Sequence, residues 1–180
     1  TYPWSGSIRI KVDPEKRIAF DLKLRIPGWA RQARATVNGE TVDVERRTKN
    51  GYLSIAREWK PDDEVALELP MPPERVYAHP SVRMDVGRVA LKRGPLVYCV
   101  EEADNPGGRV QRLELKRSAK LQTEERLDLF NGIVSITAEA SRLVDAGWAS
   151  QLYRTEPPVA KPATLTAIPY YLWNNRQRGS

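Results

Sequence analysis

The chain has 180 residues, of which 41% are hydrophobic and 29% are charged. This is the composition of a folded globular protein, so we exclude extensive disorder, and no apolar run is long enough to cross a membrane. The net charge of +6 is spread over both halves of the chain. Nucleic-acid-binding domains usually carry a concentrated basic stripe, so we expect neither a nucleic-acid partner nor a membrane partner.

Alternating apolar and polar residues dominate the first part of the chain. Ile18–Ile26 has an apolar residue at every second position, which predicts a strand with one face in a core and the other in water. The pairs Asn38–Gly39 and Asn50–Gly51 favour tight turns between further short strands. Residues 6–70 are therefore predicted to form about six strands, without a helix.

A proline-containing segment at 71–88 separates this region from a second set of predicted strands. The sequence therefore predicts an all-β protein with two antiparallel β-sandwich domains in tandem, jelly-roll-like, over residues 1–80 and 81–180. Within the second domain, apolar or alternating residues predict the strands 86–91, 96–100, 110–115, 133–138 and 163–173.

Few residues have the potential for catalysis. Cys99 is the single cysteine, so the chain can form neither an internal disulfide nor a cysteine-based zinc site, and its apolar neighbours predict a buried thiol. His79 is the single histidine, and beside a proline we expect it to be structural or exposed. Glu101 and Glu102 are adjacent, so on a strand they would point to opposite faces and could not flank one glycosidic bond. We therefore expect no catalytic, cofactor-binding or metal-binding residue in this chain.

The five tryptophans all lie close to Pro or Gly. Exposed aromatic rings can stack on the apolar face of a sugar, but small cores and interdomain contacts use aromatic side chains more often. The candidate residues for contact with another domain or with a sugar are Trp4, Trp29, Trp59, Tyr170, Tyr171 and Trp173.

Six motifs follow one another along the chain: Tyr2–Gly6, Leu24–Ala30, Val37–Gly39, Gly51–Trp59, Arg93–Tyr98 and Ile168–Arg176. Their order and spacing resemble the C-terminal half of glycoside hydrolase family 127, formerly a domain of unknown function, whose type members are β-L-arabinofuranosidases. The resemblance covers essentially the whole chain. Where the family favours glycine in a turn, this chain has Asp62, a residue type that tolerates the left-handed backbone region.

The resemblance implies a longer parent protein. In the family, an (α/α)6-barrel catalytic domain precedes two β-sandwich domains, and its nucleophilic cysteine is held on zinc by further cysteines and a glutamate. Cys99 has no paired cysteines beside it and does not match that motif, so zinc is expected only in the upstream domain. Both ends of the chain suggest a segment of a longer protein, and a last strand after Arg176 is expected to be missing.

Three functional hypotheses follow. In the first, the chain is an ancillary region that packs against and stabilises the upstream catalytic domain, and is inactive alone. In the second, it is a carbohydrate-binding module whose surface aromatics contact plant-derived, arabinose-containing glycans. A protein–protein interaction domain is a third reading. Oligomerisation is left open, and the sequence indicates no cellular compartment.

Overall fold

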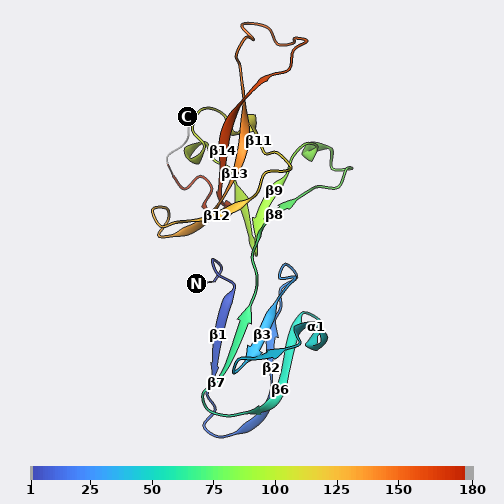
Figure 1. Cartoon of the computed structure of the whole chain (residues 1–180), viewed down its shortest axis with the longest axis vertical. Coiled ribbons are helices and arrows are strands. Elements are labelled where there is room, and N and C mark those ends of the chain that lie inside the picture. Colours follow the sequence, from blue (N-terminus) through green and yellow to red (C-terminus); the bar gives the residue numbers. More distant parts are fainter. Residues whose placement is uncertain (1, 177–180) are drawn as a thin grey trace. The chain divides into compact units, whose positions relative to one another are not determined.

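The computed structural model describes residues 2–176 and divides the chain into two compact units, residues 1–72 (unit 1) and residues 73–180 (unit 2). Every strand pair is antiparallel, so the all-β, antiparallel prediction is confirmed (Figure 1). The division lies before the expected boundary at 80/81. The reason is that Pro73–Val76 forms a strand, β8, which pairs with a strand of unit 2.

Unit 1 contains two sheets, one four-stranded in the order β1-β7-β3-β4 and one three-stranded in the order β2-β6-β5. The alternating segment Ile18–Ile26 forms β2 as predicted, although only the C-terminal half of that strand enters the core. The elements of unit 1 are β1 (Ser7–Val12), β2 (Ile18–Arg25), β3 (Arg34–Val37), β4 (Glu40–Val42), α1 (Val44–Arg47), β5 (Thr48–Lys49), β6 (Tyr52–Trp59) and β7 (Asp63–Glu68).

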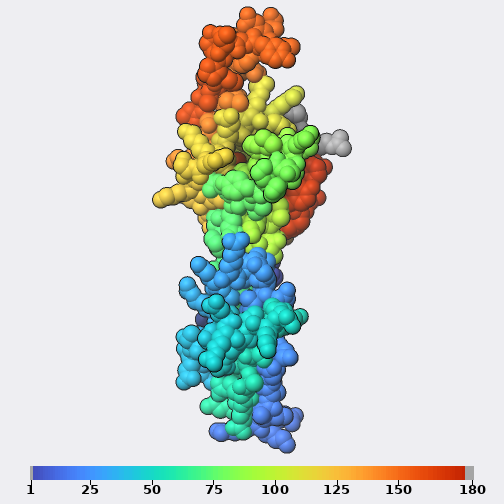
Figure 2. All heavy atoms as spheres, turned by 90° about the vertical axis from the view of Figure 1, so that its right-hand side faces the viewer, coloured from blue at the N-terminus to red at the C-terminus, as the bar shows by residue number. Residues whose placement is uncertain are grey.

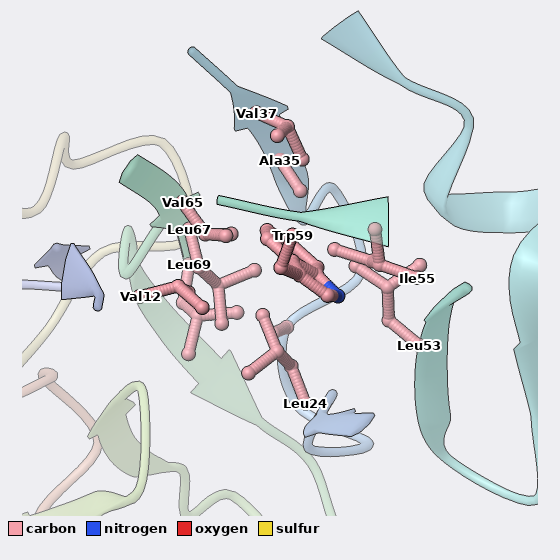
Figure 3. Close-up of a cluster of buried hydrophobic side chains, with 11 residues drawn as sticks. Val12, Leu24, Ala35, Val37, Leu53, Ile55, Trp59, Val65, Leu67 and Leu69 are labelled. Atoms are coloured by element: carbon pink, nitrogen blue, oxygen red, sulfur yellow. The ribbon is translucent and has the colours of Figure 1, made fainter. Parts of the chain in front are cut away.

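Trp59, at the end of β6, occupies the centre of the unit 1 core (Figure 3). Its side chain is fully buried, and its indole Nε1 donates a hydrogen bond to the Phe20 carbonyl oxygen at 3.1 Å. The Phe20 ring stacks on the indole at 5.6 Å, and the Arg57 guanidinium lies 5.2 Å from the ring centroid. Trp59 therefore has no surface available to a sugar or to another domain, and we remove it from the candidate contact residues.

The turn between β6 and β7 is held by a buried carboxylate. Asp62 adopts the left-handed conformation, φ 66°, at the turn position where the resemblance led us to expect glycine. Asp63 is fully buried and accepts hydrogen bonds from the Lys60 backbone N–H at 3.0 Å and from the Asn38 amide at 2.8 Å. These donors lower the pKa of the Asp63 carboxyl. The ionised group therefore stabilises the fold above the unfolded-state pKa, and this contribution is lost as the pH falls through the lowered pKa.

Unit 2 is built on one seven-stranded sheet in the order β11-β13-β14-β10-β9-β8, with β12 also paired to β13. The long hairpin of β13 and β14 is its largest strand pair. The elements of unit 2 are β8 (Pro73–Val76), η1 (Arg83–Asp85), β9 (Ala90–Arg93), β10 (Leu96–Cys99), η2 (Glu102–Asp104), η3 (Val110–Arg112), β11 (Leu113–Glu114), β12 (Gln122–Arg126), β13 (Ile133–Val144), β14 (Val159–Pro169) and η4 (Tyr170–Leu172).

Three strand predictions in unit 2 are wrong in part. The segment predicted as a strand over 86–91 is strand only from Ala90, where β9 begins. Residues 110–115 form the 3₁₀ turn η3 followed by the two-residue strand β11, and strand β14 ends at Pro169 instead of continuing to Trp173. Apolar residues continue beyond Pro169, so composition alone could not locate the end of the strand. The chain turns there into η4.

Buried polar groups join the loops of unit 2 to its sheet. The Tyr98 hydroxyl donates to the Val134 carbonyl oxygen at 2.8 Å, and burial raises the pKa of Tyr98 to about 12. Asn105 is 2% exposed. Its side-chain amide donates one hydrogen bond to the Thr166 carbonyl oxygen and accepts another from the Thr166 N–H, each at 2.8 Å. Arg142 donates to the carbonyl oxygens of Asn105 and Gly108. The loop after β10 is thus held to β13 and β14 by side chains.

Replacing the core tryptophan tests the assignment of Trp59 to the core. We expect Trp59→Ala to lower the free energy of unfolding by about 3–5 kcal/mol, because a large buried ring is lost and a cavity remains. Tyr52→Ala, at an aromatic residue on the same strand that is 48% exposed, is the matched control. Denaturant unfolding followed by circular dichroism measures both. An equal effect of the two substitutions would contradict the assignment.

Candidate contact surface

The aromatic platform, which we define as Tyr170 and Trp173, lies directly after β14. The two rings stack with centroids 5.9 Å apart and an interplanar angle of 9°. The Trp173 N–H donates to the Tyr170 carbonyl oxygen at 3.0 Å, and this 3₁₀ turn places side chains i and i+3 on one side. The rings are 55% and 56% exposed. The stacking therefore holds both rings in place while each keeps apolar surface exposed to solvent.

The turn, rather than a strand, creates the platform. On the strand that the sequence predicts, Tyr170 and Trp173 would point to opposite faces of the sheet, because they are three residues apart. Tyr171 lies between them and is 57% exposed. The stacking of Tyr170 on Trp173 could not be predicted from alternation.

Ionic contacts fix the segment that follows the platform. The Asn174 N–H donates to Glu101 Oε1 at 2.7 Å, and the Arg176 guanidinium pairs with Glu101 at 2.5 Å and with Asp104. The Arg176 side chain is 22% exposed, and those of Glu101 and Asp104 are 12% and 5% exposed. The hydrogen bonds that Arg176 donates to the Asp104 carboxylate raise the pKa of Arg176 further above its usual value. These charges were not identified as a group from the sequence, because 72 residues separate Asp104 from Arg176.

A cavity of about 200 Å³ lies between Val100–Ala103 and Trp173–Arg176. Small-molecule sites usually have about 300–1,000 Å³, so this cavity is small for a bound sugar. The Glu101 carboxylate in its wall is already paired with Arg176. Glu101 and Glu102 therefore do not form a catalytic pair here, and the exposed rings of the platform are the part of this surface best suited to a contact.

The remaining candidate tryptophans belong to unit 1. Trp29 is partly buried and packs against the hydrophobic core, and Trp4 is partly buried near the N-terminus. Each keeps some exposed surface, so both remain candidates for a contact outside this chain. Trp148, which was not a candidate, is covered on one face by the Arg154 guanidinium at 4.5 Å from the ring centroid.

Cys99 and His79 lack the environment of catalytic groups. Burial raises the pKa of the Cys99 thiol to about 11, and the negative charges of Glu101 and Asp104 add to this effect. His79 is exposed, and its Nδ1 accepts a hydrogen bond from the Ser81 N–H at 3.2 Å. A neutral thiol is a poor nucleophile and a poor metal ligand, so burial disfavours both functions for Cys99.

Among residues 2–176, no group of three or more His, Cys, Asp and Glu side chains could hold a metal ion. The zinc that the resemblance associates with the family therefore does not fit the described residues, and we assign no reaction step to this chain. In the same part of the chain, no helix is long and apolar enough to span a membrane.

Two family models together match nearly the whole chain. The model of the "GH127 middle domain" of β-L-arabinofuranosidase matches residues 1–71, and that of the "Glycoside hydrolase family 127 C-terminal domain" matches residues 73–180. The chain belongs to glycoside hydrolase family 127. The family assignment made from the six motifs is thereby confirmed, and the two matched segments correspond to units 1 and 2.

The similar proteins are much longer than this chain. A non-reducing end β-L-arabinofuranosidase of Bifidobacterium longum subsp. longum is 34% identical over 99% of this chain, which spans 28% of that protein. The crystal structure of a GH127 β-L-arabinofuranosidase from Geobacillus stearothermophilus T6 matches with a TM-score of 0.93 and 48% identity, over 99% of this chain and 28% of the other. A second GH127 β-arabinofuranosidase structure matches with a TM-score of 0.84 and 37% identity, over 97% and 28% of the two chains.

The raised pKa of Cys99 predicts slow and strongly pH-dependent alkylation. Because only the thiolate reacts, about one molecule in a thousand is reactive at pH 8 if the pKa is about 11. We expect the rate with iodoacetamide to increase roughly tenfold per pH unit throughout pH 7–9.5. The chain unfolded in denaturant is the control, and its rate should level off near the usual cysteine pKa of about 8.5. An alkylation rate that stops increasing below pH 9 in the folded chain would contradict the prediction.

Proposed function

We propose that this chain is the ancillary β-sandwich region of a β-L-arabinofuranosidase-like glycoside hydrolase, and that it packs against and stabilises a catalytic domain in another part of the polypeptide. The main support for the proposal is that this chain is much shorter than the protein it resembles. The chain aligns over 99% of itself with an arabinofuranosidase of which it spans only 28%. The (α/α)6 barrel that the family resemblance implies would account for much of the remaining length.

The surface features of unit 2 support a fixed contact between domains. Interfaces are enriched in Tyr and Trp, and a ring that is already held in place loses little conformational entropy when it is covered. Tyr170 and Trp173 hold each other by stacking, and the salt bridges of Arg176 fix the segment behind them. The platform therefore resembles one half of a preformed interface.

Catalysis, in this proposal, is performed by the other part of the polypeptide. The Cys99 thiol is protonated at neutral pH, and Glu101 is neutralised by Arg176. We therefore expect the separate chain to leave arabinofuranosides unhydrolysed. Its contribution to the reaction is indirect, through the stability of the domain on which it packs.

A carbohydrate-binding module is the second candidate function. The exposed, nearly parallel rings of the aromatic platform favour it, because sugars present their C–H groups to flat aromatic faces. The ligand would be a plant-derived, arabinose-containing glycan. Stacking between the two rings leaves only their outer faces free, and the adjacent cavity of about 200 Å³ adds little enclosure.

Removing the platform from the intact polypeptide tests the first proposal. We expect Tyr170→Ala and Trp173→Ala each to destabilise the intact enzyme by about 2 kcal/mol, the size of an interface hot spot, and to shorten its active lifetime on heating. The same substitutions should leave the separate chain almost unchanged, because both rings are exposed there. Tyr153→Ala, at a tyrosine that is 90% exposed, is the control. Equal and negligible shifts for all three variants in the intact enzyme would contradict the proposal.

Affinity electrophoresis in gels containing arabinan separates the two candidate functions. If the first proposal holds, the separate chain should migrate at the same rate with and without arabinan, because its platform is built to contact protein. Retardation that Trp173→Ala abolishes and Tyr153→Ala preserves would instead establish the carbohydrate-binding module. A gel containing bovine serum albumin in the neighbouring lane controls for nonspecific retardation.

A further inference from the structure

The connection between β8 and β9 forms a second, chemically different surface on unit 2. In Figure 2 this connection, residues 77–89, appears in green on the face of unit 2 that is turned toward the viewer. Together with Leu115 and Arg117 it encloses a cavity of about 330 Å³. Arg75, Arg88 and Arg117 all line this cavity, which we call the arginine pocket.

Successive turns order the loop although most of its residues are exposed. The Val82 N–H donates to the His79 carbonyl oxygen at 2.8 Å, and the Asp85 N–H donates to the Val82 carbonyl oxygen at 3.1 Å. The Arg88 N–H then donates to the Asp85 carbonyl oxygen at 2.9 Å, in a turn where Gly87 adopts φ +76°. The loop therefore has a defined backbone that positions the pocket side chains.

The charges of the arginine pocket are unbalanced. Three arginines line it, and Asp85 is the one acidic residue among the lining residues. Within the part of the chain that the structure describes, the side chains of Arg88 and Arg117 make neither a hydrogen bond nor an ion pair. Arg75 donates to the Ala119 carbonyl oxygen at 2.5 Å, but its Nε is buried and has no hydrogen-bond partner. Like charges around one cavity raise the local potential and favour an anion there.

Neutral groups of the pocket add a donor and an apolar face. Because the Nδ1 of His79 accepts a hydrogen bond from the Ser81 N–H, the neutral ring carries its proton on Nε2 and can donate from that atom. The Tyr77 ring is 59% exposed at the pocket wall. An aromatic face beside charged donors suits a ligand that has both an anionic group and C–H groups.

The size of the pocket favours a small ligand. A volume of about 330 Å³ is at the lower end of the range of about 300–1,000 Å³ for small-molecule sites. Guanidinium groups bind carboxylates through two parallel hydrogen bonds, which makes them selective for planar anions. Because the chain belongs to a glycoside hydrolase family, a sugar that carries an anionic group is the ligand class that we consider first.

We propose that the arginine pocket binds the carboxylate of an acidic sugar residue, a hexuronate, within a glycan. Arg88 and Arg117 hold the carboxylate, and the Tyr77 ring contacts the sugar ring. The site shares no residue with the aromatic platform. It therefore stands independently of the proposed packing against a catalytic domain.

Calorimetric titration of the intact polypeptide with trigalacturonate tests the proposal. We expect saturable binding that weakens at least about tenfold in Arg88→Ala and in Arg117→Ala, since each substitution removes a charge-assisted contact. Arg88→Lys should recover only part of the affinity, because an ammonium group cannot form the paired hydrogen bonds of a guanidinium. Arg83→Ala is the matched control, because Arg83 lies in the same loop and is exposed but does not line the pocket. It should bind like the unmodified protein.

Other probes identify the ligand class. Neutral galactotriose should not bind at the arginines, and inorganic phosphate should bind at least tenfold more weakly than trigalacturonate. Equal affinity for phosphate would overturn the hexuronate assignment, as would an equal loss of affinity in Arg83→Ala. Absence of trigalacturonate binding would also overturn it. If Arg88→Ala then lowered the Tm of the intact polypeptide, the pocket would instead be covered by carboxylates from the rest of that polypeptide. Tyr170→Ala separates this site from the proposed function, because it should leave trigalacturonate binding unchanged.

Discussion

A β-sheet that faces water on one side must bury its other side, and the two units of this chain meet this requirement differently. In unit 1, two separate sheets enclose the indole of Trp59, and the bond from its Nε1 to the Phe20 carbonyl leaves no polar atom of the ring unsatisfied. The turn that follows Trp59 is held by hydrogen bonds to the buried Asp63 carboxylate. One large ring thus lies at the centre of the packing in unit 1.

Unit 2 has a core of smaller side chains and relies more on buried polar groups. Ile136 and Ala167 fill the centre, while Asn105 and Arg142 connect a loop to the sheet through backbone hydrogen bonds. An unpaired polar group in such a place is costly, so these side chains specify one loop conformation. Arg176 acts in the same way beside the aromatic platform. Both surfaces to which we assign contacts are therefore formed by loops that are held in place.

The two surfaces differ in chemistry, and this difference separates their proposed roles. Tyr170 and Trp173 present flat apolar rings without a free charge between them, which suits a contact with another domain. Arg88 and Arg117 present positive charge around a cavity, and neither has a partner among residues 2–176, which suits a small anion. Neither surface brings together a nucleophile and an acid. The chain belongs to glycoside hydrolase family 127, and our proposal assigns the chemistry of the family to another part of the polypeptide.

The sequence by itself determined many of the strands and turns, and the family. The alternation at Ile18–Ile26 indicates which side chains lie on the same face of a strand. The order of the six motifs can be read from the sequence directly, so the family could be assigned without the structure. Only the tertiary structure showed that Trp59 is buried, that Tyr170 and Trp173 stack, and that three distant arginines line one pocket. The physical reason is that local periodicity fixes the direction of a side chain relative to its own strand. Burial and proximity depend on which strands pair and where a strand ends, and these are decided by contacts between residues far apart in the chain.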